Sequence, residues 1–180
     1  MRQANDLKDG DPRIRPLPEE RLPADLKEKV YRLEDLGILS STVPARIWAH
    51  RPVQATNWLS LIESFYSESV LTERLRELIR LRIAAITNCE ACKLARKSDT
   101  VSAEDVACIA AGDERFNRAE HAAMDFAARL AGDHDTITDK TFEQLRTYFS
   151  DEQIVEINMF AALMLAGGRM THAQKAYSGS

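Results

Sequence analysis

The sequence predicts an all-α fold, a bundle of about eight helices, and two observations carry that prediction. Apolar residues recur at helical spacing in almost every segment from Leu22 onward. No stretch alternates apolar and polar residues as a half-buried strand would. At 180 residues the chain can bury a core without disulfide bonds. We therefore expect a single helical domain over residues 22–180.

The N-terminal segment differs from the rest of the chain. Residues 1–23 are polar and contain four prolines, which remove backbone donors and disfavour helix. We expect residues 1–21 to form an extended arm that is either disordered or packed on a neighbouring subunit. The segment lacks the apolar core of a secretory signal, and the longest apolar run, near Met159, is too short to span a bilayer. We expect a cytoplasmic protein without a membrane partner.

The first helices are indicated by apolar spacing and by their end signals. Residues 23–37 carry leucine and valine on one helical face and end at Gly37. Residues 43–67 predict a short helix, a break at Pro52 and then a longer helix.

The next stretch holds two of the three cysteines. Residues 71–88 predict a helix with Thr72 as its N-cap. Asn88 can cap a further helix that carries Cys89 and Cys92 in its first turn. The C-x-x-C pair is therefore expected at the N-terminus of a helix.

The remaining helices fill the C-terminal half. Residues 102–112 and 115–132 each predict one helix, and a third begins at Thr138. Ser150 and Gln153 have the spacing of a capping box for the last helix. The middle of that helix is apolar all round, so we expect it to be central and buried.

The cysteine pair favours redox chemistry. Three residues apart on a helix, Cys89 and Cys92 share a face and can approach disulfide distance. The free N–H groups of a first turn favour a thiolate, which is the reactive form. Lys93 and Arg96 each lie four residues after one of the cysteines and add positive charge. In the cytoplasm such a pair is more often catalytic, redox-active or metal-binding than a structural disulfide.

Other readings of the cysteines stay open at this point. A zinc site needs four ligands, and the chain offers only Cys108 and four scattered histidines besides the pair. We therefore expect no metal and no cofactor. The two thiols could also be small buried apolar groups, and we expect that of Cys108. Net charge is −4 and no stretch concentrates basic residues, so we expect no nucleic-acid partner.

A family resemblance adds to this. The stretches "LRELIRLRIAAITNCEACKLA" and "FEQLRTYFSDEQIVEINMFAALMLAGGRM" resemble the carboxymuconolactone decarboxylase family, in its alkylhydroperoxidase-D-like branch. The resemblance runs from roughly Trp58 to the C-terminus. The motif of that branch is a glutamate, eleven residues, C-x-x-C, three residues and a histidine.

The motif is matched in three of its four positions. Glu77, Cys89 and Cys92 stand where the family has its glutamate and cysteines. Arg96 takes the place of the histidine, and Ala91 takes the place of a further histidine often found between the cysteines. An arginine stays charged and cannot relay protons as histidine does near pH 7.

The resemblance implies a fold, an assembly and an activity. It implies an all-helical alkylhydroperoxidase-D-like subunit in a homo-oligomer, a trimer or hexamer. It implies thiol-dependent reduction of alkyl hydroperoxides, with the disulfide recycled by a dithiol reductant or adaptor protein. Cys92 would attack the peroxide, Cys89 would resolve the intermediate, and Glu77 would belong to a proton relay. Arg96 and Lys93 would stabilise the thiolate or hold a substrate oxygen.

Two other functions fit the same residues. A non-redox enzyme could process a lactone or carboxylate, as a decarboxylase does, with Glu77 as general acid or base and Arg96 on the carboxylate. A non-catalytic helical oligomer could sense oxidation through the cysteine pair. Glu77 could also be an exposed helix residue paired with Arg80. The four arginines from Arg74 to Arg82 indicate a solvated, salt-bridged face or, alternatively, an oligomer interface.

Overall fold

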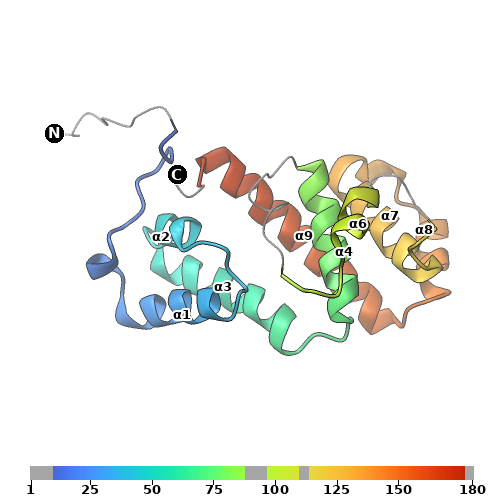
Figure 1. Ribbon diagram of the computed structural model, residues 1–180, viewed down its shortest axis with the longest axis horizontal. Helices are drawn as coiled ribbons and strands as arrows, with labels where there is room; N and C mark the ends of the chain where they lie inside the picture. Colours follow the sequence, from blue (N-terminus) through green and yellow to red (C-terminus); the bar gives the residue numbers. More distant parts are fainter. Residues whose placement is uncertain (1–9, 88–96, 110–113, 177–180) are drawn as a thin grey trace. The chain divides into compact units, whose positions relative to one another are not determined.

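The structure is a computed structural model that describes residues 10–87, 97–109 and 114–176, and in these ranges it contains helices and no strand (Figure 1). The all-α prediction is confirmed, since eight α-helices lie in the described ranges. Two short 3-10 helices accompany them, η1 (Glu19–Arg21) and η2 (His134–Thr136). The α-helices are α1 (Ala24–Asp35), α2 (Val43–Trp48), α3 (Pro52–Ser67), α4 (Glu73–Ile86), α6 (Ala103–Cys108), α7 (Arg118–Gly132), α8 (Asp139–Arg146) and α9 (Asp151–Gln174).

Helix ends follow the expected signals. Thr72 caps α4, because its side chain accepts the N–H of Leu75 at 3.2 Å. Pro52 begins α3, as the break predicted there requires. Gly37 follows α1 with φ of +71°, a conformation that glycine adopts without a Cβ penalty. The helix expected over 102–112 ends at Cys108, and its predicted stop at Gly112 lies outside the described residues.

The contacts group into two compact units, residues 1–66 with 170–180, and residues 67–169. That 22–180 forms one domain stays a prediction. In the first unit, α1 to α3 bury a leucine-rich core. Glu63 on α3 ties α3 to α1, since it pairs with both Lys29 and Arg32.

The described part of the N-terminal arm lies on its own chain. The N–H of Arg13 donates to the carbonyl of Gln174 at 2.8 Å, and the N–H of Leu17 donates to the carbonyl of Arg46 at 3.1 Å. Arg46 returns a bond from Nε to the carbonyl of Leu17 at 2.7 Å. These hydrogen bonds fix residues 10–21 on α2 and on the end of α9 of the same chain, and packing of the arm on a neighbouring subunit stays a prediction.

The second unit is built around α4 and α7. These helices pack on each other, and α7 also packs on α8. A cluster of buried side chains joins α4 to the segments around α6 and α7: Leu78, Leu81, Val101, Ile109, Phe116 and Met124. Val106 and Cys108 are partly buried against that cluster. The expectation that Cys108 packs on the core is confirmed.

Helix α9 begins as predicted but is not buried all round. The Ser150 N–H donates to Gln153 Oε1 at 3.1 Å and the Gln153 N–H to Ser150 Oγ at 3.3 Å, which is the expected capping box. In the middle, Ile157 and Phe160 are fully buried, whereas Met159 is 50% exposed. The burial prediction is wrong because it counted apolar residues on every face, and the fold covers only one side.

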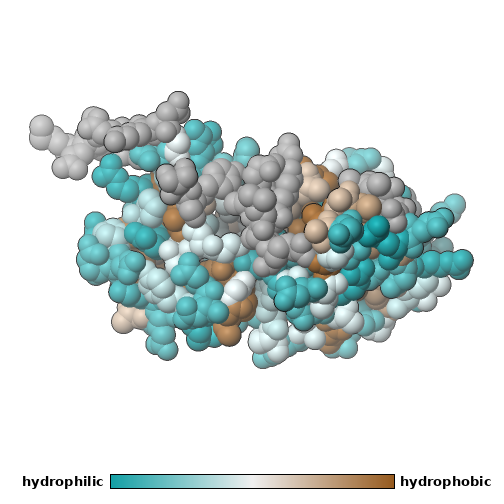
Figure 2. Space-filling view, viewed as in Figure 1, coloured by the Kyte–Doolittle hydropathy of each residue, from teal (hydrophilic) through white to brown (hydrophobic). Residues whose placement is uncertain are grey.

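The expectation that the stretch around Met159 is too short to span a bilayer is wrong for the helix as a whole. By length and composition alone α9 could cross a membrane, a test that the core helix of a soluble protein also passes. Two of its charged side chains make contacts within the second unit. Glu156 accepts hydrogen bonds from Ser69 Oγ and from the N–H of Val70, and Arg169 donates to the carbonyl of Ala131. The face of the molecule in Figure 2 is largely hydrophilic, with small separate hydrophobic areas.

Candidate functional site

Glu77 lies buried in the middle of α4. Its side chain is 2% exposed, and Arg80 is 6% exposed beside it. One helical turn separates the two, so the guanidinium meets the carboxylate in a bidentate pair, Nε to Oε2 and Nη2 to Oε1, both at 2.7 Å. The pairing that the spacing predicts is confirmed. The exposed setting is wrong, because packing on α4 buries this face.

The carboxylate of Glu77 also binds the chain beyond the cysteine-bearing segment. Its Oε1 accepts the backbone N–H of Lys97 at 3.1 Å. The last residue described before the cysteines, Thr87, lies ten positions along α4 from Glu77, which on a helix is about 15 Å of axial rise. The two residues that flank positions 88–96 therefore lie at different heights along α4. Thr87 is at its C-terminal end, and Lys97 is bound to its middle.

Lys97 has an ammonium group with an unusual setting. Burial lowers its pKa to about 8, and the positive charge of Arg80 acts in the same direction. The carboxylate of Glu77 opposes both, with a smaller effect. A lysine with such a pKa can give up a proton near neutral pH, whereas an arginine such as Arg80 stays charged.

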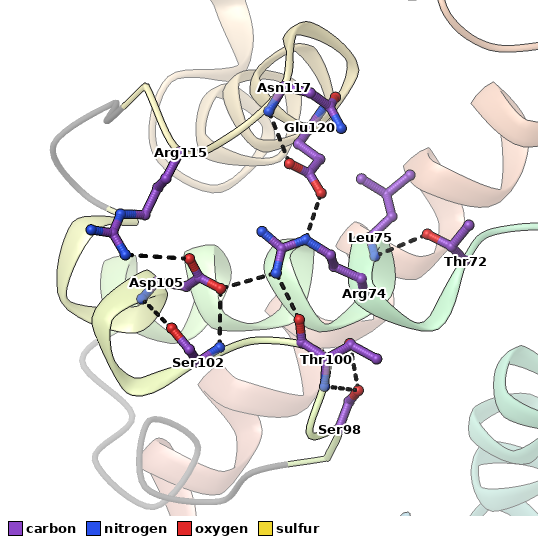
Figure 3. A network of polar contacts seen from close by, with 10 residues as sticks. All are labelled: Thr72, Arg74, Leu75, Ser98, Thr100, Ser102, Asp105, Arg115, Asn117 and Glu120. Atoms are coloured by element: carbon purple, nitrogen blue, oxygen red, sulfur yellow. Dashed lines mark hydrogen bonds and ion pairs between the residues drawn. The ribbon is translucent and has the colours of Figure 1, made fainter.

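Arg74, one turn before Glu77, anchors the same segment at a second point (Figure 3). Its Nη1 donates to the carbonyl of Thr100 at 2.6 Å and to Asp105 Oδ2 at 2.9 Å. Its Nε donates to Glu120 Oε1 at 2.8 Å. α4 thus holds the segment that follows the cysteines at Lys97 and again at Thr100.

The two carboxylates that bind Arg74 also close helix caps. Asp105 accepts the N–H of Ser102 at 3.0 Å, and Glu120 accepts the N–H of Asn117 at 3.0 Å, so each completes a capping box. The bond from the Ser102 N–H, with help from Arg74, holds the pKa of Asp105 below its usual value. Negative charge at a helix N-terminus is favourable. The arginines of α4 are therefore not the solvated face that the sequence suggested.

Four predicted site residues lie outside the described residues: Cys89, Cys92, Lys93 and Arg96. The helix expected from Asn88 lies there too. Of the predicted site, the structure places Glu77, and it places it against the residue that directly follows this segment. The proximity of the two thiols to each other and to Glu77 stays a prediction.

The same arrangement of helices occurs in solved structures. An AhpD core, from a peroxidase-related protein of Ralstonia eutropha JMP134, matches with a TM-score of 0.73 at 21% identity, over 92% of this chain and 91% of that chain. A peroxidase-related protein from Silicibacter sp. TM1040 matches with a TM-score of 0.71 at 18% identity, over 88% and 87%. The debrominase Bmp8 matches with a TM-score of 0.72 at 22% identity, over 90% and 89%.

The chain has the AhpD-like fold. The resemblance to the alkylhydroperoxidase-D-like branch is confirmed at that level. No protein-family model and no curated protein matches the chain. At identities of 18% to 22% the shared property is the fold, and the fold includes proteins of different activity, since one of the three is a debrominase.

Two residues that lie beside Glu77 in this AhpD-like fold were assigned no functional role from the sequence. Arg80 is predicted only as the partner of an exposed glutamate, although its spacing carried the signal for the pair. Lys97 has no role assigned from the sequence, and its lowered pKa depends on burial that no local pattern reveals. Among the residues that the structure describes, no three histidine, cysteine or acidic side chains converge as metal ligands.

Proposed function

We propose that the protein is a thiol-dependent peroxidase that reduces alkyl hydroperoxides with Cys92 and Cys89. One observation supports this most: the buried Glu77–Arg80 pair binds the backbone N–H of Lys97, the residue that follows the cysteine-bearing segment in the chain. A helix does not need a buried ion pair for its stability, and here such a pair involves Glu77, the one motif residue that the structure describes. Buried, paired charges of this kind are common at functional sites. Its presence in an AhpD-like fold fits a site built around the cysteines.

The first step reduces the peroxide. The Cys92 thiolate attacks the terminal oxygen of the hydroperoxide, and the S–O bond forms as the O–O bond breaks. Cys92 becomes a sulfenic acid, and the alkoxide takes one proton and leaves as an alcohol. The peroxide gains two electrons, which the sulfur loses.

The second step and the recycling restore the thiols. Cys89 attacks the sulfenic sulfur, a disulfide forms, and hydroxide leaves and takes a proton to become water. A dithiol partner, as a small reductant or an adaptor protein, then exchanges with this disulfide. It leaves oxidised, and both cysteines return as thiols.

The proton steps are assigned to Glu77 and Lys97. Glu77 accepts the proton that the Cys92 thiol gives up, and Lys97 supplies the proton for the departing alkoxide. Lys97 thereby takes the part that Arg96 cannot, because Arg96 stays charged. Arg96 and Lys93 stabilise the thiolate. We expect turnover to fall above pH about 8, where Lys97 loses its proton.

The test is peroxide consumption with tert-butyl hydroperoxide and dithiothreitol. We expect Cys92→Ser to abolish turnover and Cys108→Ser, the matched control, to leave it intact. Cys89→Ser should yield one equivalent of sulfenic acid and no disulfide, seen by mass spectrometry. Unchanged turnover in Cys92→Ser would exclude the mechanism.

Two outcomes would support the other readings. An activity on lactones or carboxylates that survives loss of both cysteines but disappears in Glu77→Gln would indicate the non-redox enzyme. A reversible Cys89–Cys92 disulfide without turnover would indicate a redox sensor.

A second substrate class is favoured by one comparison. Bmp8 is a debrominase of this fold, and a cysteine-to-alanine variant of it was solved in complex with 2,3,4-tribromopyrrole, with a TM-score of 0.73 to this chain at 19% identity. The same pair of thiols could reduce a bromopyrrole: two thiols become a disulfide, carbon exchanges bromide for hydrogen, and bromide leaves with one proton. Bromide release from tribromopyrrole, measured beside peroxide consumption, separates the two substrates.

A further inference from the structure

A pocket in the first unit is separate from the residues of the candidate site around Glu77. It has a volume of about 340 Å³ and is lined by the arm, α2, α3 and the end of α9. That volume falls within the range of small-molecule sites. All of its lining residues belong to residues 1–66 and 170–180. The pocket is therefore independent of Glu77 and of the proposed peroxidase function.

The walls of the pocket are aromatic and aliphatic. Trp48 and Trp58 meet edge to face, with ring centroids 6.2 Å apart at 76°. The Nε1 of Trp48 donates to Gln174 Oε1 at 3.1 Å, which fixes the orientation of that ring. Ile14 and Met170 also line the space. Such a surface suits a flat or short apolar group and is already formed, so little ordering is needed on binding.

The charge around the pocket has one sign. No lining residue is acidic, and Arg51 brings a cation to it. Arg51 is exposed, and its guanidinium makes no ion pair with the residues that the structure describes. His50, the other ionisable lining residue, binds the carbonyl of Arg15 through Nε2 at 3.0 Å. An anionic group on a ligand would therefore complement the charge of Arg51.

We propose that this pocket binds a small aromatic carboxylate, with its ring against the wall that the two tryptophans form and its carboxylate on Arg51. The arm takes part, because Ile14 comes from it and the bonds of Arg13 and Leu17 hold it in place. The apolar lining residues suit the ring of the ligand. Arg51 and the lack of acidic lining residues suit its carboxylate.

The chain offers a direct optical test. Trp48 and Trp58 are its only tryptophans and both line the pocket, so tryptophan emission reports on this site. We expect 4-phenylbutyrate to change that emission saturably, with a Kd below about 1 mM. The uncharged 4-phenylbutanamide should bind about tenfold more weakly.

Matched variants separate the charge from the apolar wall. Arg51→Gln should reduce affinity for the acid to that for the amide and leave the amide unchanged. Ile14→Ala should weaken both ligands alike, and Arg21→Gln, an exposed arginine outside the pocket, should change neither. Equal affinity for acid and amide, no saturable change, or an unaltered Arg51→Gln would overturn the proposal. Cys92→Ser should bind like the unmodified chain, so the outcome is independent of peroxidase activity.

Discussion

The Glu77–Arg80 pair is a charged contact that is costly to bury and costly to break. Both side chains have left water, and this desolvation offsets most of their mutual attraction. Each remaining partner is then needed: Glu77 accepts two bonds from Arg80 and one from the Lys97 N–H. Removal of one charge would take away the bidentate partner of a group that stays buried.

Single and double substitutions should therefore differ sharply. We expect Glu77→Gln and Arg80→Met each to lower the free energy of unfolding by about 3–5 kcal/mol, and Glu77→Gln/Arg80→Met to lose much less than the sum. Urea unfolding of the four proteins gives the coupling. Additive losses would show that the pair is more hydrated than its burial indicates.

Lys97 links the same site to pH. Its pKa is about 8 when folded, against 10.5 ordinarily, so the folded state disfavours its charged form. Below pH 8 this penalty is present in full. Between pH 8 and 10.5 the unfolded chain binds more protons, so stability rises with pH and the penalty disappears.

Lys97→Met should remove this pH dependence. At pH 7 we expect the variant to be more stable, by on the order of 2 kcal/mol after solvent screening, and the difference to vanish near pH 10.5. Thermal unfolding over this range measures it. Lys140→Met, at an exposed lysine, is the control. A difference that stays constant with pH would contradict the assignment.

At this scale the sequence predicted identities better than environments. Glu77 followed from the motif and its contact with Arg80 from helical spacing. Burial of the pair, and the return of the chain to Glu77 at Lys97, depend on which elements pack on α4. Those contacts join residues 20 positions apart, and no local pattern specifies them.

At the scale of elements, Arg74 connects three helices. It lies on α4 and binds a carboxylate from the first turn of α6 and another from the first turn of α7 (Figure 3). Asp105 and Glu120 keep their cap bonds without it, but they would lose the cation that holds α6 and α7 on α4. The cap at Ser102 and the helix spacing were predictable from local patterns, whereas this connection joins residues far apart in the chain.

Arg74→Met should therefore weaken the packing of these helices. We expect a loss of about 1–3 kcal/mol in the free energy of unfolding, since three hydrogen bonds that the partly buried guanidinium donates disappear. Arg129→Met, which breaks the exposed Arg129–Asp125 pair on α7, should cost far less, because solvent screens a pair at the surface. Hydrogen exchange should localise the effect of Arg74→Met to α6 and the start of α7. Equal losses in both variants would show that the three-helix connection adds little.

For the whole molecule, periodicity and capping signals were sufficient to predict the described helices. They were not sufficient to predict which faces of those helices are buried. α9 illustrates this. Its apolar residues predicted a helix covered on all sides, yet Val155 is 57% and Met159 is 50% exposed. One turn separates these residues, so they form one apolar strip on the open side of α9. A sequence records that a residue is apolar, and the partner that covers it can be another chain.

The homo-oligomer proposed from the family resemblance makes that strip a natural place for a second copy. If a second copy packs on this strip, Met159→Lys should place a charge in an apolar contact. The molar mass in solution should then fall from that of a trimer or hexamer toward that of one 20.3 kDa chain. Analytical ultracentrifugation measures the mass, and circular dichroism confirms that the helices persist. Val53→Lys, at another exposed apolar residue on α3, is the matched control and should leave the mass unchanged. An oligomer whose mass is unaltered by Met159→Lys would place the interface elsewhere. A monomeric unmodified chain would contradict the homo-oligomer that the family resemblance implies, while the thiol chemistry would still be tested by Cys92→Ser.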